Sequence, residues 1–224
     1  MTPKPPSDHH FRESIRIASI GERKYVRYFD GRGHFAHLRL ELAPDDGSSV
    51  TILRGEGLGI PDACYGAAET ALKDATRHGS LRGFPCCGFS IRITGGTYLA
   101  PYSYPEAFAN VARMALEDGL LRGMRVVVEP WCEIVLRTPG HWLEGLSRKL
   151  HQLLGETTLD LRTGLSTFEV TLSLPARAWL LFTKSFPAEA IEVLSTRPHR
   201  PHYRPVLQLP GLSLPEEGPF QDWS

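Results

Sequence analysis

The sequence FSIRITGGTYLAPY, residues 89–102, predicts a buried strand that leads directly into an exposed turn. Phe89, Ile91 and Ile93 alternate with polar residues, so one face of the strand is apolar. The glycine pair after the strand is typical of a turn, because glycine accepts backbone angles that other residues avoid. We expect this turn, residues 94–102, to be one of two surfaces that decide what the protein binds.

Amphipathic patterns predict a helix on each side of this strand. The first opens at Pro61 and ends at Gly79, and its alanines at every fourth position form a small-residue stripe that can approach a sheet closely. The second begins at Pro105 and turns an apolar face around Phe108 towards the same sheet. A glycine-rich segment, residues 55–59, is interpreted as a flexible connection and not as a phosphate-binding loop. The strands expected in this half are residues 11–20, 22–29, 35–42, 50–53 and 84–93.

The second half of the chain repeats strands and helices in the order β-α-β-β-α-β, which is the ferredoxin-like split unit. The elements expected there are strand 126–136, helix 141–154, strands 157–161 and 167–174, helix 175–184, a short apolar element at 188–194 and strand 203–209. The predicted fold class is therefore α+β, with two domains. The expected divisions are a disordered leader at 1–10, domains at 11–125 and 126–210, and a flexible tail at 211–224.

Composition and cysteine use predict a cytoplasmic protein without a membrane span. The 224 residues carry 25 basic and 25 acidic side chains, and no run approaches the roughly 18 apolar residues that a span needs. The proline-rich start has no apolar signal segment, and it is interpreted as a natural start. Cys64, Cys86, Cys87 and Cys132 lack the spacing of a zinc site, so we expect buried, reduced thiols.

Several catalytic signatures are absent from the sequence. It contains no Gly-x-x-x-x-Gly-Lys-Ser/Thr loop, no Gly-x-Ser-x-Gly elbow and no His-Glu-x-x-His helix. We therefore expect no catalytic residue, no cofactor, no metal and no GTP binding by this chain.

A local basic excess remains near the first predicted hairpin. Between Arg12 and Leu40 there are seven basic and three acidic residues, interleaved with aromatic residues. Arginine suits phosphates and aromatic rings suit unpaired bases, so this pattern is compatible with RNA binding. A half-buried sheet with a solvated basic face explains the same composition.

Motifs in both halves resemble the C-terminal half of translation elongation factor G. Phe11-Arg12-Glu13-Ser14-Ile15 and Asp30-Gly31-Arg32-Gly33-His34-Phe35-Ala36-His37 are similar to the opening of its domain IV, which typically reads Tyr-Arg-Glu-Thr-Ile and then Gly-Gly-Arg-Gly-Gln-Tyr-Gly-His. Glu129-Pro130, Leu146-Ser147-Arg148 and Leu172-Ser173-Leu174-Pro175 resemble parts of its domain V. The resemblance covers residues 11–210.

The resemblance implies a domain like the second domain of ribosomal protein S5, followed by a ferredoxin-like domain. In the family, two tip loops of domain IV enter the decoding centre of the ribosome, and they fall here on residues 30–34 and 97–102. The implied RNA-binding residues are Arg27, Arg32, His34, Arg39, Tyr98 and Tyr102. This chain departs from the family in lacking the GTPase domain and in carrying Leu99 where the family has a tip histidine.

The resemblance therefore implies a non-enzymatic, stand-alone relative that binds the ribosome or ribosomal RNA. A protein-interaction module is the alternative, because the second tip is unusually apolar, with Leu99, Pro101, Tyr102 and Tyr104. A small-molecule enzyme is a third interpretation, and it would require a concave site lined by Glu69, Asp74 or Glu106.

Overall fold

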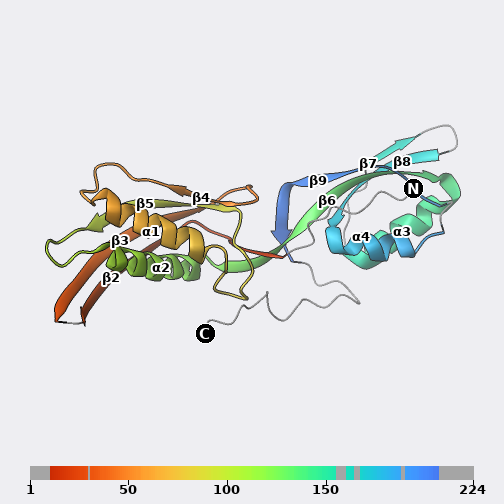
Figure 1. The fold of residues 1–224 in the computed structure, drawn as a ribbon. Helices are drawn as coiled ribbons and strands as arrows, with labels where there is room; N and C mark the ends of the chain where they lie inside the picture. Colours follow the sequence, from red (N-terminus) through yellow and green to blue (C-terminus); the bar gives the residue numbers. More distant parts are fainter. Residues whose placement is uncertain (1–10, 30, 155–159, 164–166, 188–189, 207–224) are drawn as a thin grey trace. The chain divides into compact units, whose positions relative to one another are not determined.

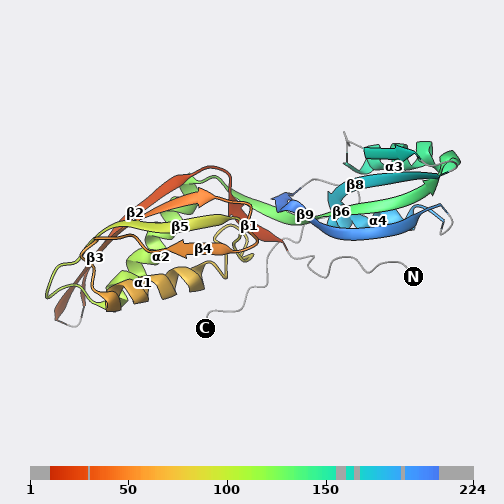
Figure 2. The ribbon, with the colours of Figure 1, turned by 90° about the horizontal axis from the view of Figure 1, so that it is seen from above.

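The computed structural model describes residues 11–29, 31–154, 160–163, 167–187 and 190–206 (Figures 1 and 2). The chain divides into two compact units, one made of Arg12–Val127 and one that continues from Val128. We expected the division after residue 125. Strand β6 (Arg125–Pro139) runs through both positions, so the division falls inside a strand and not in a loop.

The first unit is a four-stranded sheet of order β2-β3-β5-β4, and helices α1 and α2 cover one of its faces (Figure 1). β2 and β3 form an antiparallel hairpin, β3 is antiparallel to β5, and β5 is parallel to β4. The elements are β2 (Ser19–Phe29), β3 (Arg32–Pro44), β4 (Val50–Leu53), α1 (Asp62–Ala75), β5 (Phe89–Thr97) and α2 (Pro105–Arg122).

Alternation along the strands puts the apolar residues between the sheet and the helices, as the sequence predicts. Phe89, Ile91 and Ile93 of β5 are buried in one core cluster with Phe108 of α2. The predicted stripe on α1 is correct only in part. Ala71 and Leu72 are buried as predicted, but Ala63 is exposed, and the helix also buries Cys64, Tyr65 and Ala68.

The helix α1 also ends before the expected glycine. It stops at Ala75, where the hydroxyl of Thr76 donates a hydrogen bond to the carbonyl of Lys73. Gly79 lies beyond the helix, and its backbone N–H donates to the carbonyl of Phe84. The glycine therefore belongs to the turn that follows the helix.

The first expected strand, residues 11–20, is broken. β1 (Arg12–Ile15) ends at a bend, and β2 starts afresh at Ser19. The cause is tertiary, because the backbone N–H groups of Arg16 and Ile17 both donate to the carbonyl of Gly123, after α2.

Glu13 of β1 is a buried carboxylate, 3% exposed, that organises the loop after α1. One oxygen accepts backbone N–H groups from Arg82 (2.7 Å) and Phe84 (3.1 Å), and the other accepts the N–H of Leu81 (2.8 Å). Buried charges are tolerated where hydrogen bonds satisfy them. These hydrogen bonds explain how a carboxylate can be buried in the middle of β1.

The four cysteines are buried thiols that form no disulfide, as predicted. Cys86 and Cys87 lie before β5, which starts at Phe89 and not at residue 84. Burial raises the pKa of the Cys86 thiol to about 12, with smaller effects of nearby Glu13 and Cys87. Burial also raises the pKa of Cys132 to about 11.

In the second unit β6 lies between β8 and β9, and β8 also pairs with β7, all antiparallel. One long strand, β9, replaces the two elements expected at 188–194 and 203–209. Residues 157–159, 188–189 and 207–209 of the expected elements lie outside the described residues. The elements after β6 are the short 3-10 helix Gly140–Trp142, α3 (Leu143–Leu154), β7 (Asp160–Thr163), β8 (Thr167–Pro175), α4 (Ala176–Lys184) and β9 (Glu192–Pro205).

The second unit has its own apolar core and a buried ion pair. Leu136, Leu146 and Phe182 belong to the core. Glu129, which is 1% exposed, accepts hydrogen bonds from the Nε and Nη2 atoms of Arg177. Among the described residues, no helix combines the length and apolar character needed to cross a membrane.

Candidate nucleic-acid interface

The hairpin end formed by β2 and β3 extends beyond the two helices (Figure 1). Gly31, with φ of 70°, lies between the strands in the left-handed region that favours glycine. The register places Tyr28 opposite Gly33 and Arg27 opposite His34. The hydroxyl of Tyr28 donates to the carbonyl of Gly31 (3.2 Å), which ties the side chain to the turn.

The loop of residues 98–104 is attached to this hairpin end through backbone groups and one serine. The N–H of Phe35 donates to the carbonyl of Tyr102 (2.7 Å). The buried hydroxyl of Ser103 donates to the carbonyl of Phe35 (2.8 Å) and accepts the N–H of Leu99 (2.9 Å). The structure therefore brings together the two tips that lie far apart in the sequence.

The exposed turn is shorter than the predicted residues 94–102. β5 continues to Thr97, because a bulge keeps it paired with β3: Arg39 lies opposite Gly95, and the next residue of β3 lies opposite Ile93. Thr94 is the extra residue.

Three of the six predicted contact residues share one face of the hairpin end. Arg27 and His34 are a cross-strand pair, and Arg32 is two residues from His34 on β3, so all three project to the same side. This is the side that carries the helices further along the sheet. The ring of His34 lies 5.2 Å from that of Tyr104, centroid to centroid.

Tyr102 lies on the opposite face. A Cβ placed on Gly33 would be 3.1 Å from Cδ1 of Tyr102, so the tyrosine ring covers the position where Gly33 has no side chain. Tyr98 is exposed and is the first residue after β5. The predicted set is therefore divided between two faces.

Arg39 is separate from the rest. It is five residues beyond His34 on β3, which corresponds to about 17 Å along a strand. Its guanidinium also lies 3.9 Å from the carboxylate of Glu22. The structure therefore places Arg39 outside the hairpin end, although it remains on the open face of the sheet.

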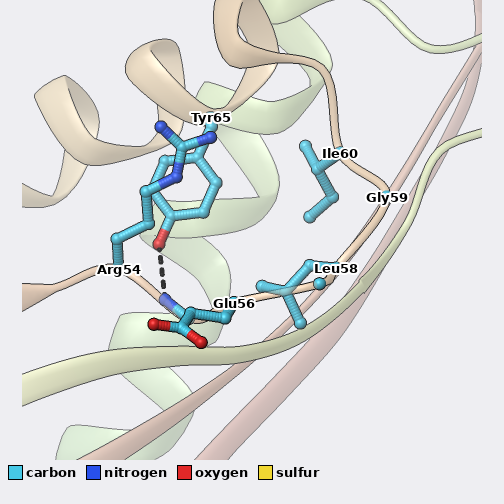
Figure 3. A pocket seen from close by; sticks show the side chains of 8 residues that line it. Arg54, Glu56, Leu58, Gly59, Ile60 and Tyr65 are labelled. Carbon is cyan, nitrogen blue, oxygen red and sulfur yellow. Dashed lines mark hydrogen bonds between the residues drawn. The ribbon is translucent and has the colours of Figure 1, made fainter.

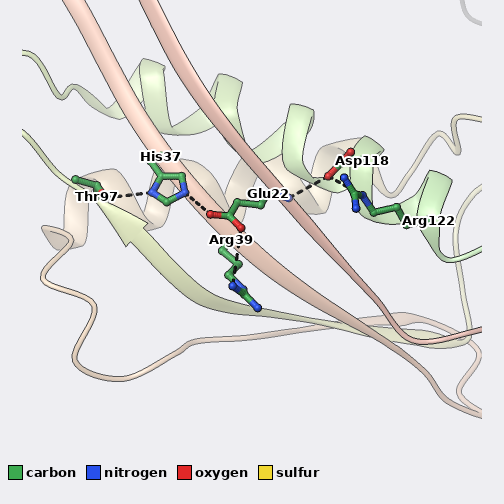
Figure 4. A network of polar contacts seen from close by, with 6 residues as sticks. All are labelled: Glu22, His37, Arg39, Thr97, Asp118 and Arg122. Atoms are coloured by element: carbon green, nitrogen blue, oxygen red, sulfur yellow. Dashed lines mark hydrogen bonds and ion pairs between the residues drawn. The ribbon is translucent and has the colours of Figure 1, made fainter.

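A polar network that the sequence reasoning missed connects three strands beside Arg39 (Figure 4). His37 Nε2 lies 2.8 Å from the carboxylate of Glu22, and His37 Nδ1 lies 3.1 Å from the hydroxyl of Thr97. A carboxylate only accepts, so Nε2–H donates to Glu22, and the Thr97 hydroxyl donates to Nδ1 when the imidazole is neutral. The network holds β5 at the point where the loop leaves it.

The base of the hairpin is held on α2 by Asp118, whose side chain is largely buried (Figure 4). It accepts the backbone N–H of Glu22 (3.2 Å) and pairs with Arg122 (3.2 Å) and Arg23 (2.9 Å). Burial alone would raise its pKa, but these bonds and charges outweigh burial, and the pKa lies below its ordinary value. Gly21 allows the close approach, because a Cβ there would lie 1.9 Å from the carbonyl oxygen of Ala115.

Two side chains on the open face of the hairpin are strongly exposed. Val26 is 69% exposed and Tyr28 is 79% exposed. Alternation along β2 separates both from Tyr25, which packs against the core.

A surface depression of about 450 Å³ lies beside the start of α1 (Figure 3). It is lined by the glycine-rich segment and by Tyr65, whose hydroxyl accepts the N–H of Gly55 (3.1 Å). The guanidinium of Arg54 lies 4.3 Å from the Tyr65 ring centroid and pairs with Asp62. None of Glu69, Asp74 and Glu106 lines this depression.

Comparisons with known proteins agree with the sequence resemblance. The family model of elongation factor G, domain IV, matches residues 10–124, just over half of the 224 residues. A crystal structure of a protein from Thermus thermophilus is similar over 89% of this chain, with a TM-score of 0.64 and 22% sequence identity. This chain spans 31% of the length of that protein, and at this identity the similarity shows a shared fold. The chain belongs to the elongation factor G domain IV family.

Proposed function

We propose that this chain is a non-enzymatic, translation-related protein that binds the ribosome or structured RNA through its hairpin end. Family membership supports the connection with translation. The contact surface consists of Arg27, Arg32 and His34 together with the adjoining loop of residues 98–104. The chain acts in the cytoplasm, and it neither binds nor hydrolyses GTP.

The finer fold assignment is part of this proposal. Residues 11–125 form a domain like the second domain of ribosomal protein S5, and residues 126–210 form a ferredoxin-like domain equivalent to domain V. The order of elements after Val128 and the strand order β9-β6-β8-β7, with every neighbouring pair antiparallel, support the ferredoxin-like assignment.

The observation that carries the proposal is the attachment of the loop to the hairpin. The bonds from Phe35 and Ser103 hold two segments from different parts of the chain at one projecting end. That end presents two exposed arginines, Arg27 and Arg32, at positions fixed by the strand pairing. Arginine on a rigid support suits phosphate oxygens, because its planar group forms paired hydrogen bonds.

Co-sedimentation with purified ribosomes at several salt concentrations tests the proposal. Binding should occur at low salt and weaken as salt rises, since each lost phosphate contact changes the slope of log K against log salt by about 0.7–0.9. Arg32→Ala should weaken binding and reduce the magnitude of that slope by the amount expected for about one phosphate contact. Arg92→Ala is the control, because Arg92 is exposed on β5 about 17 Å before Thr97. Absence of binding at low salt would overturn the proposal.

A protein-interaction module is the second candidate function. Leu99 is 47% exposed at the tip of the loop. A phosphate backbone would offer this leucine no apolar partner, whereas a protein surface could. This function predicts a partner protein that is retained after ribonuclease treatment and is lost on Leu99→Ser.

A further inference from the structure

The open face of the hairpin end carries a group of apolar and aromatic side chains. Cross-strand pairing puts Tyr28 beside Gly33 and Val26 beside Phe35, and these positions project to the same side. The ring of Tyr102 lies over Gly33 on that side. We name this surface, made of Val26, Tyr28, Gly33, Phe35 and Tyr102, the aromatic face.

The two tyrosine rings of the aromatic face are exposed, and hydrogen bonds hold the Tyr28 hydroxyl and the backbone of Tyr102. Tyr28 is 79% exposed and Tyr102 is 48% exposed. The hydroxyl of Tyr28 is bonded to the carbonyl of Gly31, and the backbone of Tyr102 is bonded to Phe35 and Leu99. A ligand that stacks on these rings would therefore lose little conformational entropy on binding.

The charges around the aromatic face favour a polyanion as the ligand. Arg27 and Arg32 project from the opposite face of the same two strands, and Lys24 is exposed next to the aromatic face, on the same side of β2 as Val26. In the sequence from residue 23 to residue 38 the one acidic residue is Asp30. RNA sites combine aromatic rings that stack on the bases with nearby cations that contact the phosphates, and the hairpin end offers both kinds of side chain.

We propose that the aromatic face binds unpaired bases of single-stranded RNA, which stack on Tyr28 and Tyr102. Arg27 and Arg32 contact the phosphates of the same strand as it passes the edge of the hairpin. This inference rests on the proposed function, because it names the kind of RNA that the hairpin end takes. A duplex cannot satisfy it, since the faces of paired bases are already covered by their neighbours in the helix.

The test uses the full chain and three labelled probes at one salt concentration. The first is an oligouridylate of about 12 nucleotides, within the roughly 4–16 that a single-strand binding fold covers. The second is an abasic phosphodiester strand of the same length, and the third is a blunt RNA duplex. Fluorescence anisotropy gives the affinity of the chain and of each variant for each probe.

Tyr28→Ala and Tyr102→Ala should each weaken binding of the oligouridylate by about 5- to 150-fold, which is the range for one lost stacking contact. Neither should change the affinity for the abasic strand or the duplex. Tyr28→Phe is the matched control, because it keeps the ring and removes only the hydroxyl bond to Gly31, so it should bind oligouridylate more tightly than Tyr28→Ala does. Folding is not at risk with Tyr28, since most of its side chain is exposed.

Two results would overturn the inference. In the first, the tyrosine variants bind oligouridylate as tightly as the parent chain does, while Arg27→Ala and Arg32→Ala lower the affinity for all three probes. The proposed function would then stand, but without base stacking on the tyrosines. The tyrosine variants could also leave RNA binding unchanged and abolish binding of a purified partner protein, which would assign the aromatic face to protein recognition. Failure to bind any probe or ribosomes at low salt would instead overturn the proposed function itself.

Discussion

Replacing Glu13 by glutamine should lower the free energy of unfolding of the first unit by about 2–4 kcal/mol. The carboxylate accepts three backbone N–H groups, two on one oxygen and one on the other. Glutamine keeps one oxygen, which can still accept from Arg82 and Phe84. Its amide nitrogen then faces the N–H of Leu81, so one charge-assisted bond, worth about 1.5–3 kcal/mol, is lost and the other two weaken.

Urea unfolding followed by circular dichroism gives the stability change, and hydrogen exchange at the amides of residues 81, 82 and 84 locates it. The variant should unfold at lower urea and lose protection first at these amides. Glu117→Gln is the control, because Glu117 is exposed on α2, and it should stay within about 0.5 kcal/mol. Unchanged stability together with unchanged protection would refute the reasoning that the loop depends on this carboxylate.

Three further predictions concern other parts of the first and second units. Gly21→Ala should cost about 1–3 kcal/mol in urea unfolding, because its Cβ would overlap the carbonyl of Ala115 and push the hairpin from α2. Asp118 has a lowered pKa in the folded state, so the ionised carboxylate stabilises the fold above about pH 4. This stabilisation is lost as the pH falls through the pKa that Asp118 has in the folded state. Asp118→Asn should therefore flatten that part of a plot of unfolding free energy against pH. Cys86 and Cys132, with pKa values of about 12 and 11, should react with a thiol reagent at pH 8 only as fast as the chain unfolds.

The elements that could be predicted were those whose local pattern and tertiary packing agree. Alternation in β3 and β5 and the apolar face of α2 were sufficient to assign the core side of each. The break at residues 16–18 was not predictable in the same way, because alternation continues through it and the cause is the distant carbonyl of Gly123. The buried face of α1 was misjudged because alanine at every fourth residue is compatible with either of two adjacent helix faces. The structure buries the face that carries the ring of Tyr65.

The candidate site was predictable in its location but not in its arrangement. The resemblance placed both tips, yet the division of contacts between two faces follows from the register of β2 with β3, which no single position reveals. Ser103 bonds to Phe35, which lies 68 residues away in the sequence, and nothing about a serine in a turn indicates so distant a partner. The network of His37 likewise depends on residues from three strands.

The way the 98–104 loop is attached has a consequence for how this surface can change over evolution. Its anchors are main-chain atoms and one buried hydroxyl, while the side chains of Tyr98, Leu99 and Tyr102 are exposed. Selection can therefore exchange the exposed side chains one at a time without unfolding the scaffold beneath them. In a library randomised at these positions, most variants should still fold, and they should differ in what they recognise. A new binding preference can thus arise in this loop without a new fold, which is consistent with a family member whose tip carries leucine in place of the usual histidine.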